Sequence, residues 1–161
     1  MLTRTRLNDS LGLVGFLVIC FAIAAIGGSV TSGSVGTWYV ALNKPSFNPP
    51  NWIFGPVWTV LYATMAIAAW RVWRIVGWRN GFEALFLFAI QLGLNLAWSV
   101  LFFGLHRVGA AMVCIVALWL GIAATAAAFR KIDRLAAWLM VPYLAWVSFA
   151  ALLNFSIWRL N

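Results

Sequence analysis

Apolar residues run along the chain in five long stretches that contain no charged side chain. The stretches span residues 10–30, 52–70, 84–105, 108–129 and 135–158. Each is close to the roughly 20 residues that an α-helix needs to cross the hydrocarbon core of a bilayer. The pattern predicts an all-α membrane protein, with five transmembrane helices in one bundle and residues 1–161 forming a single domain.

The third stretch carries two stripes at helical spacing. One stripe is partly polar and consists of Gln91, Asn95, Trp98, Ser99 and Phe102. The other consists of the small residues Ala89, Gly93 and Ala97. Because the stripes are offset by about 200° around a helix, we expect the polar one to face the inside of the bundle. We expect the small residues to permit close helix packing, either with a second copy of the chain or within the monomer.

Two further stretches carry aromatic stripes at the same spacing. The second has Trp58, Tyr62 and Met65 on one face. The fifth has Pro142, Trp146, Phe149, Ala150 and Asn154 on one face. If the three stripes converge, they form a flat, mostly apolar pocket in which Asn95 orients a ligand. The alternative is ordinary aromatic packing in a helical bundle, with Asn95 bonded to a neighbouring helix.

The composition excludes a soluble enzyme, because 65% of the 161 residues are apolar, 9% are charged and the mean hydropathy is +0.95. The net charge is +8, and the charged residues lie near the ends of the expected helices. We therefore expect these residues to anchor the protein in the membrane, and we expect no nucleic acid binding. Eight basic residues fall at the N-terminal side of the bundle and three at the opposite side. In an inner membrane, this imbalance predicts a cytoplasmic N-terminus.

The chain has eleven tryptophans, and most fall near the ends of the expected helices, where indole rings anchor a protein at the membrane surface. Four of them lie deeper, where the indole N–H needs an acceptor, and are candidates for lining a cavity: Trp58, Trp98, Trp119 and Trp146.

The longest connection, residues 31–51, contains three prolines among six residues and ends in a dense aromatic and proline-rich run. Proline fixes φ and removes a backbone donor, so we expect a stiff segment that acts either as a lid over a site or as an interfacial belt.

Conventional catalytic groups are scarce. The single histidine, His106, lies in a short connection beside Arg107, and we expect a solvated residue there rather than a metal ligand. We expect no metal site.

The ordered pattern of residues resembles the TspO/MBR family, the tryptophan-rich sensory proteins related to the mitochondrial translocator protein. The residues that carry the resemblance in the first half are Trp38, Tyr39, Leu42, Lys44, Pro45, Phe47, Pro49, Pro50, Trp52, Phe54, Pro56, Val57, Trp58 and Tyr62. Those in the second half are Gln91, Asn95, Trp98, Ser99, Phe102, Phe103, Pro142–Trp146, Phe149, Ala150, Asn154 and Trp158.

The resemblance implies a five-helix bacterial membrane protein, often dimeric, whose pocket beneath the first loop binds porphyrins such as protoporphyrin IX. Carried over by position, Trp58 and Asn95 match residues that hydrogen-bond a ligand carbonyl. The positions matching the pocket lining are Trp38, Tyr39, Trp98, Trp146, Phe149 and Ala150. Ala89, Gly93 and Ala97 are the expected dimer contact.

Three functions follow from the resemblance. The first is a porphyrin-binding sensory or regulatory protein that requires no cofactor. The second is a light-dependent porphyrin-degrading enzyme, in which Tyr39 and Trp146 occupy the positions linked to that activity. The third is a transporter of porphyrins, lipids or sterols, which the sequence favours less because no spanning stretch carries a charged residue. Phe155 stands where mammalian relatives have the tyrosine of a cholesterol motif, which argues against sterol binding in the fifth helix.

Overall fold

The computed structural model describes residues 6–161, with side chains from Asn8 onward, and in that range it contains helices and no strand. Five helices are long and apolar enough to cross a membrane. They are α1 (Arg6–Val35), α3 (Phe54–Asn80), α4 (Phe82–Ser99), α5 (Val108–Arg130) and α6 (Arg134–Leu160). Three short elements complete the chain: α2 (Trp38–Ala41), the 3₁₀ turn η1 (Asn51–Ile53) and the π-helical turn η2 (Val100–Gly104). The prediction of an all-α membrane protein with five spanning helices is confirmed.

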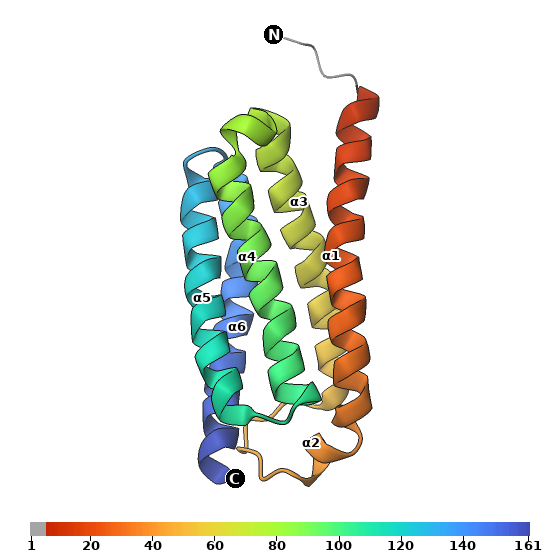
Figure 1. The fold of residues 1–161 in the computed structure, drawn as a ribbon, viewed down its shortest axis with the longest axis vertical. Coiled ribbons are helices and arrows are strands. Elements are labelled where there is room, and N and C mark those ends of the chain that lie inside the picture. The colour runs from red at the N-terminus through yellow and green to blue at the C-terminus, as the bar shows by residue number, and fades with distance from the viewer. Residues whose placement is uncertain (1–5) are drawn as a thin grey trace.

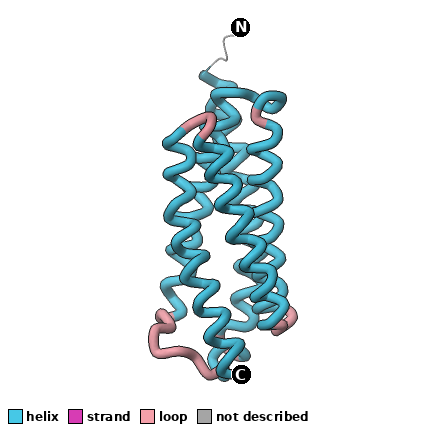
Figure 2. Tube along the Cα trace, turned by 90° about the vertical axis from the view of Figure 1, so that its left-hand side faces the viewer, coloured by secondary structure: helices cyan, strands magenta, loops and turns pink. Residues whose placement is uncertain are grey.

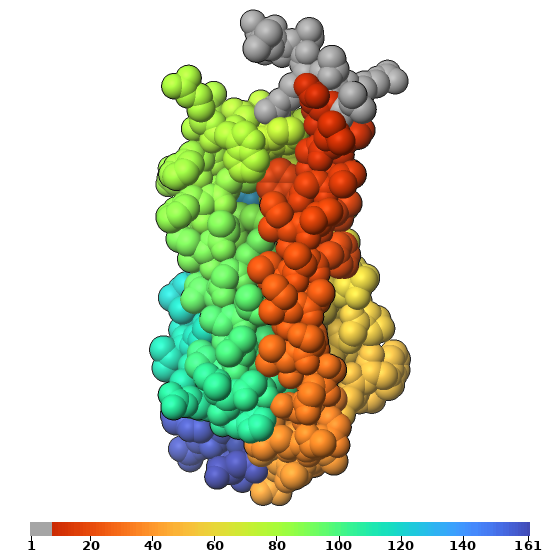
Figure 3. Space-filling model, turned by 45° about the vertical axis from the view of Figure 1, so that its right-hand side comes forward, coloured from red at the N-terminus to blue at the C-terminus, as the bar shows by residue number. Residues whose placement is uncertain are grey.

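The five long helices run side by side and pack in the order α1, α3, α6, α5, α4, with η2 and α4 returning to α1 (Figure 1). The described part of the chain begins at one end of the bundle, and the C-terminus lies at the other end with α2 (Figures 1 and 2). One outer face shows α1 lying against α4 (Figure 3). The bundle therefore has a basic end, where one short turn joins α3 to α4 and another joins α5 to α6. The opposite, loop end is covered by residues 36–53.

The expected range 84–105 is divided between α4, which ends at Ser99, and the π-helical turn η2, and two other helices extend well beyond their expected ends. α1 continues to Val35 rather than residue 30, and α3 continues to Asn80 rather than residue 70. Arginine favours helix formation, so the arginines of α3 mark where the apolar span ends and not where the helix ends. Within α3, the backbone departs from helical φ and ψ at Gly77, whose φ of 72° is a left-handed value that suits glycine. Arg4, one of the eight basic residues counted at this end, lies outside the described residues.

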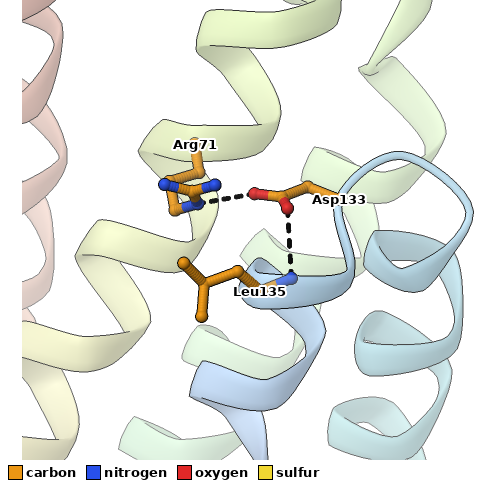
Figure 4. A network of polar contacts seen from close by, with 3 residues as sticks. All are labelled: Arg71, Asp133 and Leu135. Carbon is orange, nitrogen blue, oxygen red and sulfur yellow. Dashed lines mark hydrogen bonds and ion pairs between the residues drawn. The ribbon is translucent and has the colours of Figure 1, made fainter.

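An ion pair joins α3 to the turn before α6 at the basic end. Arg71 donates to Asp133 Oδ2 at 2.5 Å, and the second carboxylate oxygen of Asp133 accepts the backbone N–H of Leu135 at 3.1 Å (Figure 4). Asp133 is thus both the N-cap of α6 and the partner of Arg71. The hydrogen bond from Arg71 lowers the pKa of Asp133.

We expect Asp133→Ala to lower the free energy of unfolding by about 2 kcal/mol, from about 1 kcal/mol for the cap and about 1 kcal/mol for the ion pair. Asp133→Asn keeps a capping side chain and should lose only the ion-pair share. The pKa of Asp133 is lower in the folded protein than in the unfolded chain. The wild-type protein therefore has its full stability advantage over Asp133→Asn above the unfolded pKa, near pH 4. It is lost as pH falls through the lowered pKa. Thermal unfolding in detergent at several pH values measures both effects, and equal losses for Ala and Asn would contradict the capping role.

Candidate functional site

A cavity of about 260 Å³ opens inside the bundle toward the loop end. Residues of α1, α2, η1, α3, α4, η2 and α6 line it, and no lining residue among those described belongs to α5. Gly28 and Ser32 of α1 and Gly55 of α3 line it and are exposed, so the cavity reaches the outer surface beside α1 and α3. Of the two alternatives that the sequence left open, convergence of the stripes from three helices is therefore the one found at this cavity.

The structure brings seven of the eight predicted ligand-binding residues to this cavity. They are Tyr39, Trp58, Asn95, Trp98, Trp146, Phe149 and Ala150. The exception is Trp38, which is absent from the lining among the described residues. Its indole instead stacks on the ring of His106 at 4.2 Å and meets Phe102 edge-on at 5.6 Å. Trp38 thus holds α2 against the π-helical turn and the connection that follows it.

The polar stripe of α4 faces inward, as predicted, and Asn95 is its centre. Asn95 is 2% exposed, and its amide joins two tyrosines from different helices. Its Oδ1 accepts from the hydroxyl of Tyr62 at 2.7 Å, and its Nδ2 donates to the hydroxyl of Tyr143 at 2.8 Å. An amide has two N–H groups and two acceptor lone pairs, so one donor and one acceptor site of Asn95 stay available to a ligand.

Trp58 supplies a second polar group to the cavity. Its ring packs against Tyr62 at 5.8 Å and Tyr143 at 6.1 Å. Within residues 8–161, no hydrogen bond is found for its indole N–H, and the side chain is only half-buried. Trp58 and Asn95 are therefore two of the lining groups with a spare donor for a ligand carbonyl or carboxylate.

Trp98 is held by a bond that spacing alone does not reveal. Its Nε1 donates to Asn154 Oδ1 at 3.0 Å, and Asn154 Nδ2 donates to the carbonyl of Val108 at 3.0 Å. The chain of bonds joins α4, α6 and the start of α5. It fixes the plane of the Trp98 indole on the cavity wall.

Tyr39 closes the cavity from the loop side. It is 1% exposed, and its hydroxyl donates to Asn48 Oδ1 at 2.6 Å. Burial raises the pKa of Tyr39 to about 12, so the phenol stays protonated. Lys44 donates to the carbonyls of Tyr39, Val40 and Leu42 at 2.8, 3.0 and 2.8 Å, which fixes the end of α2. The proline-rich connection is therefore an ordered cover.

The same connection is joined to the end of α6. The backbone N–H of Asn43 donates to Asn161 Oδ1 at 3.0 Å, and Asn161 Nδ2 donates to the carbonyl of Asn43 at 3.0 Å. An aromatic series continues from the cover into the bundle: Tyr39 meets Phe54 at 6.5 Å, and Phe54 meets Trp146 at 6.1 Å. The cover thus has both polar and aromatic contacts with the helices below it.

One deep tryptophan does not line the cavity. Trp119 is 37% exposed, and its Nε1 donates to Ser148 Oγ at 2.8 Å on the outside of α5 and α6. Its depth suggested a cavity, but depth does not fix the direction of a side chain, and the acceptor lies on the neighbouring helix. One face of α1 also lines the cavity, which was not predicted, and it includes Ala24, Gly27 and Thr31. Their small size at helical spacing was the available signal.

The lining residues include no histidine, cysteine, methionine or charged side chain among the residues described. No group of three or more metal-ligating side chains occurs in that part of the chain either. The cavity can therefore hold a flat apolar molecule by stacking and by a few hydrogen bonds. Its own side chains offer an iron or magnesium ion no imidazole or thiolate ligand.

A sequence model of the TspO/MBR family matches residues 16–159, which include every residue that lines the cavity. The tryptophan-rich protein TspO of Chlorobaculum tepidum is 45% identical over 145 residues, covering 89% of this chain and 91% of that protein. Protein CrtK of Rhodobacter capsulatus is 42% identical over 153 residues, covering 94% and 95% respectively. The translocator protein of Sus scrofa is 41% identical over 157 residues, covering 92% and 89%.

Proposed function

The chain belongs to the TspO/MBR family, and from this premise we propose that it binds a flat tetrapyrrole of the protoporphyrin IX class and acts as a sensory or regulatory membrane protein. A relative in Cereibacter sphaeroides, 43% identical over 142 residues, carries the name tryptophan-rich sensory protein. The observation that carries the proposal is the aromatic cavity, which the indoles of Trp58, Trp98 and Trp146 line together with the amide of Asn95.

The chemistry of the lining favours a metal-free ring. Aromatic faces stack on a macrocycle, and the spare N–H groups of Trp58 and Asn95 suit its peripheral carboxylates. Since the described lining has no imidazole, thiolate or thioether, and the Tyr39 phenol stays protonated, we expect little gain in haem affinity from coordination by the protein. We expect protoporphyrin IX to bind at least as tightly as haem when both are titrated in the dark under the same conditions. Strong preference for haem, with a spectrum of protein-ligated iron, would contradict this expectation.

A second candidate function is light-dependent degradation of the porphyrin. The observation that favours it is the aromatic series from Tyr39 through Phe54 to Trp146, which places two oxidisable side chains on one cavity. In the first step, an excited porphyrin takes one electron from the indole of Trp146 or the phenol of Tyr39. The ring is then reduced by one electron and the side chain oxidised by one electron.

The test is a titration in nanodiscs in the dark, followed by illumination of the same samples. Protoporphyrin IX should quench tryptophan fluorescence in a saturable way, which supports binding. If its absorbance then decays faster than in empty nanodiscs, and Trp146→Phe and Tyr39→Phe both suppress the decay, the enzymatic function is supported. If the bound porphyrin survives as in empty nanodiscs, the binding and sensory function stands alone. Absence of saturable quenching would overturn both.

Two of the three residues in the small-residue stripe of α4 lie on the outer surface, and the third, Ala97, is half-buried. Ala89 and Gly93 are exposed, and a Cβ built on Gly93 meets nothing within 4 Å. In a membrane, the neighbour of Gly93 is therefore either lipid or a second copy of the chain. We infer that it is a second copy.

We expect Gly93→Leu to convert the dimer to a monomer, because the side chain separates two backbones that pack closely. Gly15→Leu is the matched control, since Gly15 of α1 is equally open. The mass of the protein–detergent complex, measured by light scattering, reports the change. An unchanged mass for Gly93→Leu would exclude the stripe as the contact.

A further inference from the structure

A second groove, separate from the aromatic cavity, lies on the surface between α5 and α6 at the basic end of the bundle. Its volume is about 500 Å³. Its apolar part consists of Ala126 and Ala127 of α5 with Ala137 and Val141 of α6. Three small alanines at the contact between two helices leave a narrow slot that bulkier side chains would fill.

Two arginines lie at the end of this slot. Arg130 is in the last turn of α5 and Arg134 in the first turn of α6, and both are exposed. The acid between them in sequence, Asp133, is already bonded to Arg71 and to the first turn of α6. Among the residues that the structure describes, no ion pair includes Arg130 or Arg134. The groove therefore presents two guanidinium groups without a protein counter-charge.

The position of the groove relative to the membrane decides what kind of anion it suits. Arg130 and Arg134 are the end residues of two spanning segments, Val108–Arg130 and Arg134–Leu160, so they lie at headgroup depth. Val141 is seven residues further along α6, which is about 10 Å deeper at 1.5 Å per residue. Trp138 lines the groove between these levels and is 68% exposed, as interfacial tryptophans are.

From this arrangement we propose that the groove binds an anionic phospholipid of the leaflet at the basic end. The lipid phosphate lies between Arg130 and Arg134, and one acyl chain lies along the alanines toward Val141. Guanidinium groups bind phosphate oxygens in a bidentate manner, and basic pockets between transmembrane helices suit anionic headgroups. A soluble anion would use only the arginines, whereas a phospholipid also covers the apolar slot.

The occupied groove joins the last turn of α5 to the first turns of α6. Along the chain, residues 131–133 connect these two helices at this end. The Arg71–Asp133 ion pair keeps the carboxylate away from the two arginines, so it preserves the positive charge of the groove. The basic end is also the side for which the charge distribution predicts the cytoplasm.

Native mass spectrometry and thermal unfolding in detergent test the proposal with phosphatidylglycerol and phosphatidylcholine of identical acyl chains. The wild-type protein should bind phosphatidylglycerol about tenfold more tightly. The double substitution Arg130→Gln and Arg134→Gln should remove this preference. Arg79→Gln, at an exposed arginine of the same end that does not line the groove, is the matched control and should keep it.

A second variant tests the apolar slot. Ala137→Trp should weaken the binding of both lipids, because the indole occupies the place of the acyl chain. Inorganic phosphate at equal concentration should not stabilise the protein. Equal affinity for the two lipids, an equal loss in Arg79→Gln, or full competition by inorganic phosphate would overturn the proposal. Porphyrin titration of the same variants should be unchanged, so this test is independent of the proposed function.

Discussion

Asn95→Ala is expected to lower the free energy of unfolding by about 3 kcal/mol, the largest effect we expect from a single side chain in the bundle. The amide is 2% exposed and joins Tyr62 of α3 to Tyr143 of α6 through bonds of 2.7 and 2.8 Å. Alanine leaves a cavity and removes the partner of two buried hydroxyl groups. In membrane proteins, such bonds average about 0.6 kcal/mol each, so the cavity supplies the larger share.

The measurement is thermal or denaturant unfolding in detergent, with Tyr62→Phe and Tyr143→Phe as companions. Each companion removes one hydroxyl and should cost about 1 kcal/mol. Combined with Asn95→Ala, either companion should add little, because its bond is already absent. Full additivity in these double substitutions would show that the three side chains act independently, contrary to the geometry.

Ala150→Trp is expected to reduce porphyrin affinity by about a hundredfold while the protein stays folded. Ala150 of α6 lines the cavity and is 9% exposed. An indole at this position fills space that a macrocycle needs. Because the cavity is already open, the larger side chain meets less resistance than it would in a close-packed core.

Ala145→Trp is the matched control, since Ala145 belongs to the same helix but is exposed on its outer face. Its porphyrin titration should match that of the wild-type protein, as should the melting temperatures of both variants. If Ala150→Trp retained wild-type affinity, the porphyrin site would lie elsewhere. A loss in both variants would indicate an effect on folding rather than on the cavity.

The sequence predicted the features that depend on helical period. Residues 91, 95, 98, 99 and 102 share one face of a helix and are all buried, whereas Phe86, Ala89 and Gly93 on the opposite face are exposed. The five spans follow from hydropathy and length. The convergence of three stripes was one of two alternatives, the other being ordinary aromatic packing. The spacing of residues shows which of them share a face of a helix, but it does not show which helix that face contacts.

Other features depend on contacts between helices and were out of reach. Trp119 lies as deep as Trp98 but points outward, because Ser148 of the neighbouring helix offers it an acceptor. Trp38 lies in the connection between α1 and α3, where no helical spacing predicts the direction of a side chain. Its position depends on the stacking of its indole on the ring of His106. α3 extends ten residues beyond its expected end because charge limits a span in lipid but does not end a helix.

The π-helical turn η2 can be regarded as one residue inserted into a regular helix. The N–H of Leu105 bonds to the carbonyl of Val100 at 2.8 Å, five residues back, so the turn holds one residue more than an α-helical turn. Within this turn the neighbours Phe102 and Phe103 both face inward, with exposures of 2% and 6%. Deleting one residue from 100–104 would restore ordinary helical register, and one of the two rings would then turn toward the lipid. The shape of the cavity thus depends on chain length at this turn as much as on side-chain identity.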